Sequence, residues 1–215
     1  MRYVFFIVLF ASIQVVTALI YNLRGSRRRD NVRHVLLYVP LAFPMIWYGL
    51  PNISVAVNPF AYLIAIGAVL VALSFRFRKI RLALDPKLIE LLPDMDTSVF
   101  IQTEATLIGS AILEEVFYRF YVPSANLVIG WILSASLFAV AHVLHRVTRR
   151  RLSRMDLITL AGLGAAWYGA TIIGHSLLPA IIGHLVYNGP KSLAAGLQYR
   201  KSRNQDLTDA NLIKY

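Results

Sequence analysis

The sequence predicts an all-α protein: a polytopic bundle of about seven transmembrane helices, with the N-terminus outside and the C-terminus in the cytoplasm. Three observations favour this fold class. The 215 residues are 57% hydrophobic and only 15% charged, whereas soluble domains average about 45 to 50% apolar and about 25% charged residues. The apolar residues gather in runs close to the roughly 20 residues that cross a bilayer. The basic residues follow alternate runs, as the positive-inside rule requires.

The predicted spans follow one another with little chain between them. They cover residues 3–22, 34–50, 55–75, 99–122, 127–145, 155–173 and 178–196. The first run is long and lacks a clean cleavage site, which favours a retained helix over a signal peptide. No separate soluble domain fits in the remainder. The chain therefore divides into N-terminal helices with a cytoplasmic loop over 1–98, a helical core over 99–196, and a polar, loosely ordered tail over 197–215.

The basic residues favour a membrane surface over a nucleic acid. A net charge of +11 would suit a phosphate backbone, but the positive residues lie beside the ends of the spans. They form four clusters, after the first, third, fifth and seventh runs: Arg24, Arg27, Arg28, Arg29 and Arg33; Arg76, Arg78, Lys79, Arg81 and Lys87; Arg146, Arg149, Arg150, Arg151 and Arg154; Lys191, Arg200, Lys201, Arg203 and Lys214. Seven spans bring all four clusters to one side, so we expect a multi-pass protein of the plasma (inner) membrane and no nucleic-acid partner.

The long internal loop, residues 76–98, begins with the basic stretch "RFRKIR". Its apolar residues favour a short helix at the cytoplasmic interface, where basic side chains are attracted to anionic lipid. The chain contains no cysteine, which excludes disulfides, thiolate metal sites and a cysteine nucleophile.

The fourth span carries three ionisable residues in the motif "EEVFYR". Glu115 and Arg119 are four residues apart and share a helical face, whereas Glu114 is turned by about 100°. We therefore expect Arg119 to neutralise Glu115 and to leave Glu114 without a partner in its own helix. Ionisable groups inside a span are costly, by about 2.5 to 3.5 kcal/mol on insertion scales, and usually face a bundle interior or a wet cavity.

Two further spans carry polar side chains at helical spacing. In "FAVAH", Phe138 and His142 are four residues apart; in "HLVYN", His184 and Asn188 are also four apart, and Gly183 permits close approach of a neighbouring helix. A histidine in a helical core is often simply hydrogen-bonded, and polar pairs can merely join helices. One shared cavity accounts for all three helices together better than three unrelated contacts do.

The depths of these residues differ in this arrangement. At about 1.5 Å per residue, Glu114 is expected about 12 Å, His142 about 22 Å and His184 about 9 Å from the outer edge. Helix tilt of around 20° absorbs part of this mismatch. A later start of the fourth span, or a segment near Pro123 that returns into the membrane, would absorb the rest.

These groups suit hydrolysis by an activated water. Glu114 can serve as the general base and His142 can orient the water, while His184 and Asn188 can donate hydrogen bonds to a tetrahedral oxyanion. Ser134 and Ser136 stand at unsuitable angles to His142 for a Ser-His pair. A zinc ion held by Glu114, His142 and His184 is the alternative, although the H-E-x-x-H arrangement is absent.

The three motifs, in this order, resemble those of the CPBP family (CAAX protease and bacteriocin-processing, or Abi) of intramembrane glutamic proteases. "EEVFYR" matches E-E-x-x-x-R, "FAVAH" matches F-x-x-x-H and "HLVYN" matches H-x-x-x-N. The family includes the type II CAAX prenyl endopeptidases. The resemblance covers roughly residues 100–196, and one departure is Phe120, where many members have glycine.

The resemblance implies a metal-independent endopeptidase that acts on a membrane-associated protein or peptide, for example by processing its C-terminal tail, and needs no cofactor. Glu114 and His142 would activate water, and His184 and Asn188 would form the oxyanion site. The supporting residues would be Glu115, Arg119 and Phe138. The alternatives are a non-catalytic bacteriocin-immunity or scaffolding protein, in which the same groups lock the helices, and a transporter with a carboxylate proton relay. The paired broken helices of transporters are not evident in the sequence.

Overall fold

The computed structural model describes residues 2–22, 36–51, 53–56, 58–144 and 152–212. Within these ranges the regular structure is entirely helical, which confirms the all-α class. The helices are α1 (Arg2–Asn22), α3 (Val39–Ala42), α4 (Met45–Tyr48), α5 (Pro59–Ser74), α6 (Phe77–Ala83), α7 (Pro86–Glu90), α8 (Thr97–Glu115), the π-helix η1 (Val116–Phe120), α9 (Leu127–Leu144), α11 (Arg154–Gly174) and α12 (Leu178–Leu212). Most of the first and third predicted basic clusters, with His145 and Lys214, lie outside the described residues.

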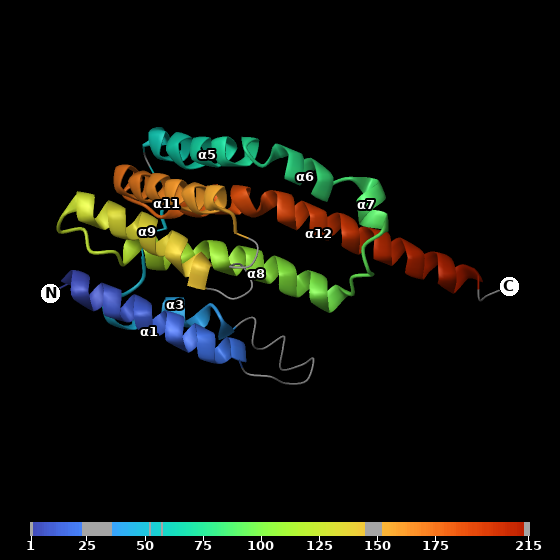
Figure 1. Cartoon of the computed structure of the whole chain (residues 1–215), viewed down its shortest axis with the longest axis horizontal. Coiled ribbons are helices and arrows are strands. Elements are labelled where there is room, and N and C mark those ends of the chain that lie inside the picture. The colour runs from blue at the N-terminus through green and yellow to red at the C-terminus, as the bar shows by residue number, and fades with distance from the viewer. Residues whose placement is uncertain (1, 23–35, 52, 57, 145–151, 213–215) are drawn as a thin grey trace.

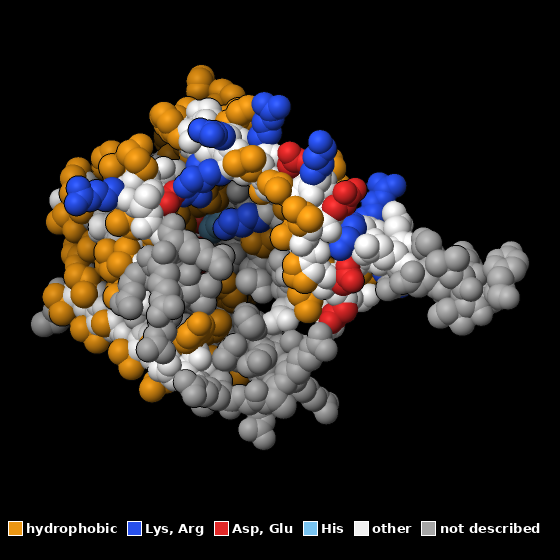
Figure 2. Space-filling view, turned by 45° about the vertical axis from the view of Figure 1, so that its right-hand side comes forward, with side chains coloured by type: hydrophobic (Ala, Val, Ile, Leu, Met, Phe, Trp, Pro, Cys, Tyr) orange, Lys and Arg blue, Asp and Glu red, His pale blue; other side chains and the backbone are white. Residues whose placement is uncertain are grey.

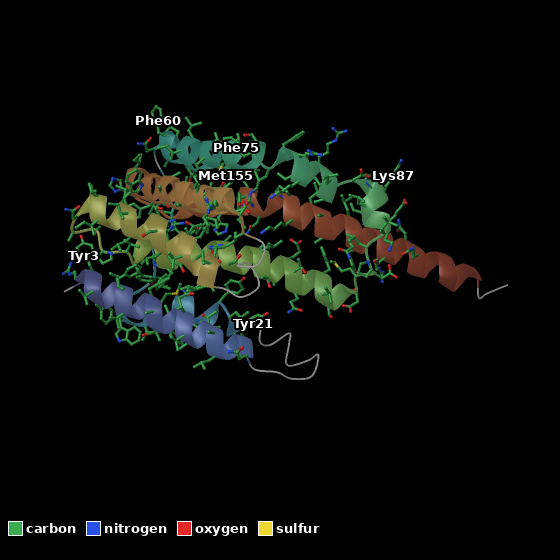
Figure 3. The ribbon with its side chains drawn as sticks, viewed as in Figure 1. Tyr3, Tyr21, Phe60, Phe75, Lys87 and Met155 are labelled. Atoms are coloured by element: carbon green, nitrogen blue, oxygen red, sulfur yellow. The ribbon has the colours of Figure 1, made fainter. Side chains whose placement is uncertain are left out.

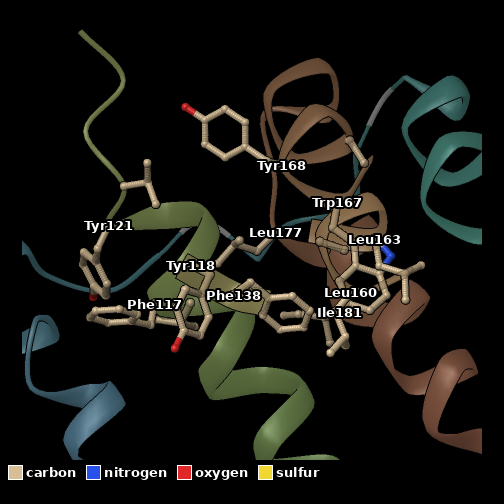
Figure 4. Close-up of a cluster of buried hydrophobic side chains, with 14 of the residues drawn as sticks. Phe117, Tyr118, Tyr121, Phe138, Leu160, Leu163, Trp167, Tyr168, Leu177 and Ile181 are labelled. Carbon is tan, nitrogen blue, oxygen red and sulfur yellow. The ribbon is translucent and has the colours of Figure 1, made fainter. Parts of the chain in front are cut away.

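The long helices lie side by side along the longest axis of the molecule (Figure 1). Helix α11 packs against α5 and α9, and α12 packs against α5, α8 and α11, while α1 lies along the edge beside α3 and α9. The core between them is aromatic (Figure 4), and its largest fully buried side chains include Phe117, Phe138 and Trp167. This packing of α8, α9, α11 and α12 around shared aromatic residues holds the polar side chains of the three motifs near one another.

Three of the described helices are long and apolar enough to cross a membrane. They are α1, α9 and α11, and they coincide with the predicted spans 3–22, 127–145 and 155–173. A fourth span is added if α5 and α6, which meet at a 76° bend, are taken as one. By length and composition, the described residues therefore contain three spans, or up to four, where the sequence predicted seven.

The predicted span 34–50 differs most from expectation, because the described part of it holds two short helices in place of one long helix. Pro40 lies in the first turn of α3, and Pro44 is the residue that precedes α4. Proline has no backbone N–H and so interrupts the helical hydrogen-bond series. Gly49, with φ of 76°, then ends α4 in a conformation that favours glycine. The two helices of this stretch, Val39–Ala42 and Met45–Tyr48, are each too short to cross a bilayer.

The expectation of a loosely ordered C-terminal tail was wrong, because α12 continues past residue 196 to Leu212. The extension is held against the segment before α8. Ser202 Oγ accepts a hydrogen bond of 2.9 Å from the backbone N–H of Met95, and Gln198 donates to the carbonyl of Pro93 at 2.8 Å. The ring of Tyr199 stacks on Phe100 with centroids 4.6 Å apart. Contacts with the 92–100 segment therefore order the polar residues.

The loop over 76–98 contains two short helices, α6 and α7, as the basic and apolar pattern predicted in outline. Asp85 caps α7 by accepting a hydrogen bond from the backbone N–H of Lys87. Asp96 caps α8 in the same way through the backbone N–H of Val99. These caps satisfy N–H groups that a helix start leaves without partners, and they fix where α8 begins relative to the site.

The connecting segments gather at two opposite ends of the molecule. At one end, Tyr3 hydroxyl accepts a hydrogen bond from the backbone N–H of Asn126 at 2.6 Å, and Tyr121 donates to the carbonyl of Gly49 at 2.7 Å. Away from this end, the Arg76 guanidinium between α5 and α6 pairs with Asp156 in the first turn of α11. Figure 3 shows Tyr3 and Phe60 toward the first end and Lys87 toward the second.

Candidate active site

The four predicted reactive residues line one cavity of about 330 Å³: Glu114 from α8, His142 from α9, and His184 and Asn188 from α12. Phe138 lines it as well. The sequence placed these residues on three helices at unequal depths, and the tertiary structure brings them to a common space. The mismatch in expected depth therefore does not keep the groups apart.

The two adjacent glutamates have different surroundings. Glu115 is fully buried; its Oε2 lies 2.8 Å from Arg119 Nε, and its Oε1 lies 2.8 Å from His184 Nδ1. Glu114 is only partly buried, lines the cavity, and has a buried Oε2 without a hydrogen-bond partner among the described residues. The predicted pairing of Glu115 with Arg119 is confirmed, and His184 is a second partner that only the fold supplies.

The Arg119 guanidinium is held on several sides. Its Nη1 donates to Ser134 Oγ at 2.8 Å and to the carbonyl of Tyr118 at 3.3 Å, while Ser134 Oγ itself donates to the Tyr118 carbonyl at 2.7 Å. The guanidinium carbon lies 4.7 Å from the centroid of the Phe138 ring, a cation-π distance. These contacts fix Arg119, and Arg119 in turn fixes Glu115.

The chain around Arg119 is a π-helix. Helix α8 ends at Glu115, and η1 follows, with the backbone N–H of Tyr121 donating to the carbonyl of Val116 five residues earlier. Such wider turns are rare and occur frequently at functional sites. They are not evident from hydrophobic spacing, because the pattern of "EEVFYR" fits an ordinary α-helix equally well.

The two histidines are oriented by different neighbours. His142 Nδ1 lies 2.9 Å from the carbonyl of Phe138 in its own helix, and its ring meets the Phe138 ring edge to face at 4.8 Å. The His184 ring stacks on Trp167 with centroids 4.7 Å apart and planes at 20°. Since a carboxylate only accepts, His184 Nδ1 donates to Glu115. The Phe138 ring also meets the His184 ring edge to face at 6.0 Å, so hydrogen bonds through Nδ1 and aromatic contacts orient both rings.

Asn188 is anchored to the helix that carries the glutamates. Its Nδ2 donates to the carbonyl of Leu107 at 3.0 Å. An amide nitrogen has two N–H protons, so this bond leaves a second donor on the same atom. The role predicted for Asn188, donation to an oxyanion, is compatible with this geometry.

Several cavity residues were missed by the sequence reasoning. Tyr38, Tyr118, Gln14, Arg76 and Lys191 also line the space. Tyr118 lies four residues after Glu114, so its helical spacing was a usable signal. The others come from elements far away in the sequence, and their positions depend on the packing of the bundle.

Glu104 and Phe120 lie close to the motif residues in the sequence but outside the cavity. Glu104 accepts a hydrogen bond of 2.7 Å from Ser192 of α12 and has a buried Oε1. It thus connects α8 to α12. Phe120, the departure from the family pattern, is 37% exposed and contacts the Tyr121 ring edge to face, so its bulk is accommodated at the surface.

Across the described ranges, with the gaps at 23–35 and 145–151, no group of three His, Asp or Glu side chains is arranged to hold a metal ion. The alternative zinc set of Glu114, His142 and His184 shares the cavity, but these three side chains do not form such a group. The described geometry therefore gives the zinc alternative no preformed ligand cluster.

The structure combines apolar helices of spanning length with a cavity lined by one glutamate, two histidines and an asparagine. These features are typical of a membrane protein of the CAAX protease-like class. Residues 96–189 match the family described as type II CAAX prenyl endopeptidase Rce1-like. This part of the chain is similar to that family of endopeptidases, in agreement with the resemblance of its motifs. No curated protein and no solved structure matched the chain.

Proposed function

We propose that the protein is a glutamate-dependent, metal-independent intramembrane endopeptidase that hydrolyses a peptide bond of a membrane-associated substrate with an activated water. One observation supports this most directly. Glu115 has two cationic or hydrogen-bonding partners, whereas Glu114, in the same cavity as both histidines, has a carboxylate oxygen with no partner among the described residues. An unengaged carboxylate in a partly enclosed site is suited to accept a proton.

In the proposed reaction, Glu114 accepts a proton from a water that His142 helps to orient. The water oxygen bonds to the carbonyl carbon of the substrate, and the carbonyl oxygen becomes a tetrahedral oxyanion. His184 and Asn188 stabilise that charge, for which losing one donor costs about 2.7 to 4 kcal/mol. When the C–N bond breaks, Glu114 returns its proton to the leaving amine, so the carboxylate is regenerated.

The substrate class follows from the family and from the apolar surroundings. The matching family is described as one of CAAX prenyl endopeptidases, and the cavity is bordered by apolar side chains of α1 and α9 as well as by its polar groups. We propose processing near the C-terminus of a lipid-modified or otherwise membrane-bound protein. The chain carries helices long and apolar enough to cross a bilayer, so the reaction would occur at a membrane, and we propose the plasma membrane.

The proposal includes the seven-span arrangement with the N-terminus outside. Two pairs of segments expected on the outer side are hydrogen-bonded at one end of the molecule, residue 3 with residue 126 and residue 49 with residue 121. The basic segment with Arg76 contacts the start of α11 away from that end. Under this proposal, α8 with η1 and the first part of α12 cross the bilayer although their polar residues lower their hydropathy.

The test is Glu114→Gln, which keeps the shape of the side chain and removes the base. We expect cleavage to fall by about 10²- to 10⁴-fold, the range for general-base catalysis, with the protein still folded at wild-type abundance. The measurement compares peptide termini in membranes and medium from cells with either protein, and Glu90→Gln, an exposed glutamate of α7, is the matched control.

Each other outcome points to a specific alternative. Termini that are unchanged while Glu114→Gln still complements a deletion would favour the non-catalytic immunity or scaffolding role. Activity of the purified protein that is lost with a zinc chelator and restored by zinc would replace the proposed mechanism with the zinc set. A proton flux that Glu114→Gln abolishes, without new termini, would favour transport.

A further inference from the structure

We propose that Ser134 of α9 is a positioning residue for His184 in the proposed reaction. It acts through two residues that lie between them, Arg119 and Glu115. This inference rests on the proposed function and adds a residue that belongs to none of the three motifs. Helical spacing gives Ser134 an unsuitable angle to His142 for a nucleophile, and the structure gives its hydroxyl a different role.

Two serines of α9 differ in what their hydroxyls bind. The exposed Ser136 donates to the carbonyl of Ile132 at 2.7 Å, one turn earlier in the same helix, which is a common local bond for a serine inside a helix. Ser134 is fully buried, and its Oγ bonds to η1 instead, at 2.7 Å from the Tyr118 carbonyl and 2.8 Å from Arg119 Nη1. The Ser134 hydroxyl therefore joins α9 to η1.

The chemistry of the two partners fixes the direction of both bonds. A carbonyl only accepts and a guanidinium only donates, so the hydroxyl proton points to Tyr118 and the hydroxyl oxygen accepts from Arg119. The other acceptors of Arg119 Nη1 are farther away, at 3.3 Å for the Tyr118 carbonyl and 3.5 Å for the backbone carbonyl of Ser134. Loss of the hydroxyl would thus leave Nη1 with only its two longer bonds.

Arg119 and His184 share one carboxylate. Arg119 Nε lies 2.8 Å from Glu115 Oε2, and His184 Nδ1 lies 2.8 Å from Glu115 Oε1. Because one oxygen binds the guanidinium and the other binds the imidazole, a shift of the guanidinium would turn the carboxylate and alter the bond that holds His184. Four side chains from α9, η1, α8 and α12 therefore form one line of contacts, from Ser134 to His184.

The part of α9 that carries Ser134 is packed closely on α11. A Cβ at Gly164 of α11 would lie 3.0 Å from Ala135 Cα, and Trp131 Nε1 donates to the carbonyl of Ala165 at 2.8 Å. Functional groups are held more precisely by rigid helices than by loops. Helix α9 therefore gives the Ser134 hydroxyl a fixed support.

Only one end of this line of contacts reaches the cavity. His184 lines it, whereas the other three members are at most 2% exposed and are not among the described residues that line it. Figure 2 shows a histidine side chain inside a hollow in this face of the molecule, with Lys and Arg side chains around the hollow. Ser134 thus acts by holding His184, without contact to the reacting atoms.

The experiment compares Ser134→Ala with Ser136→Ala, which removes a hydroxyl from an exposed position of the same helix. The full chain in phosphatidylcholine nanodiscs is assayed with a farnesylated peptide that ends in a Cys-aliphatic-aliphatic-X sequence. We expect Ser134→Ala to lower kcat by about tenfold or more, as for a lost hydrogen bond to a charged group. KM should stay within about twofold, because His184 is assigned to the oxyanion of the transition state and not to substrate binding. Ser136→Ala should change neither constant.

A second readout does not depend on activity. The chain has five histidines, so isotope labelling of histidine ring nitrogens gives few NMR signals, and a His184→Gln sample identifies those of His184. We expect the Nδ1–H signal of His184, which is bonded to Glu115, to shift or disappear in Ser134→Ala. The same signal should be unchanged in Ser136→Ala.

The outcomes separate this inference from the proposed function. A changed His184 signal in Ser134→Ala alone, in a wild-type protein that cleaves neither this peptide nor any cellular protein, supports the positioning role and overturns the protease. An unchanged signal overturns the positioning role, and the protease stands if the wild type cleaves. A loss of activity that lies in KM alone, or that Ser136→Ala reproduces, also overturns the positioning role.

Discussion

At the scale of single residues, the site depends on two adjacent glutamates with unlike partners. Glu115 is fully buried between Arg119 and His184, at 2.8 Å from each, so its charge is used to hold the structure. Glu114 lies partly buried at the cavity and keeps an oxygen without a partner among the described residues. A buried ion pair is costly to break, since removal of one partner leaves the other charged and unpaired.

Glu115→Gln is therefore expected to destabilise the protein by about 3 to 5 kcal/mol, the range for a buried pair that loses one member. Glu114→Gln should change stability little, because its Oε2 has no hydrogen bond to lose. The measurement is thermal or denaturant unfolding of both variants in the same detergent. Equal losses of stability in the two variants would contradict the division of roles.

At the scale of the elements, α12 packs closely against α11 and α5 because residue 183 is a glycine. A Cβ at Gly183 would lie 2.7 Å from Trp167 Nε1 of α11 and 3.1 Å from the carbonyl oxygen of Ala65 in α5. Trp167 Nε1 also donates to that carbonyl at 3.3 Å. The close approach predicted for Gly183 is thus realised, and it places His184 next to the Trp167 ring.

Gly183→Ala is expected to cost about 1 to 3 kcal/mol, the typical penalty for overpacking, and to reduce cleavage because His184 would move with the helix. Gly196→Ala is the matched control on the same helix, since a Cβ there meets nothing within 4 Å. It should be neutral or stabilising by up to about 1 kcal/mol, because alanine favours helix over glycine. Unfolding and activity of both variants check this, and a stable, active Gly183→Ala protein would refute the packing argument.

A second feature at this scale is that the C-terminal part of α12 packs against a segment from the middle of the chain. The extension of α12 beyond residue 196 docks on the 92–96 segment, where Lys201 bonds Asp94 at 2.9 Å. This contact holds the pKa of the Asp94 carboxyl below its usual range, through the hydrogen bond and charge of Lys201. The polar pattern of residues 197–215 predicted a loosely ordered tail, whereas contacts with the 92–96 segment hold the helix at Gln198, Lys201 and Ser202.

At the scale of the whole molecule, the connecting segments gather at opposite ends, which suits the proposed orientation across a membrane. The natural chain contains no cysteine, so single cysteines can report the side of each segment. Lys87→Cys, in α7, should react with an impermeant maleimide only from the cytoplasmic side. Ser124→Cys, in the exposed segment before α9, should react only from outside. Labelling of both from the same side would rule out seven spans with an outer N-terminus.

The fold class, one ion pair of the site and the family could be predicted from the sequence because the signals for them are local. Composition and apolar runs predicted an all-α membrane bundle, and helical spacing predicted the pairing of Glu115 with Arg119. The order of the three motifs predicted the family. Each of these predictions depends on residues a few positions apart or on averages over a span. None of them requires knowledge of which helices are in contact.

The tertiary structure decided what depends on contacts between distant segments. It joined His184 to Glu115, turned the chain after Glu115 into a π-helix and held the later part of α12 against the 92–100 segment. It also brought Lys191 into the cavity of Glu114. Hydrophobic periodicity cannot specify these features, because it records which face of a helix is apolar and not which neighbour that face meets.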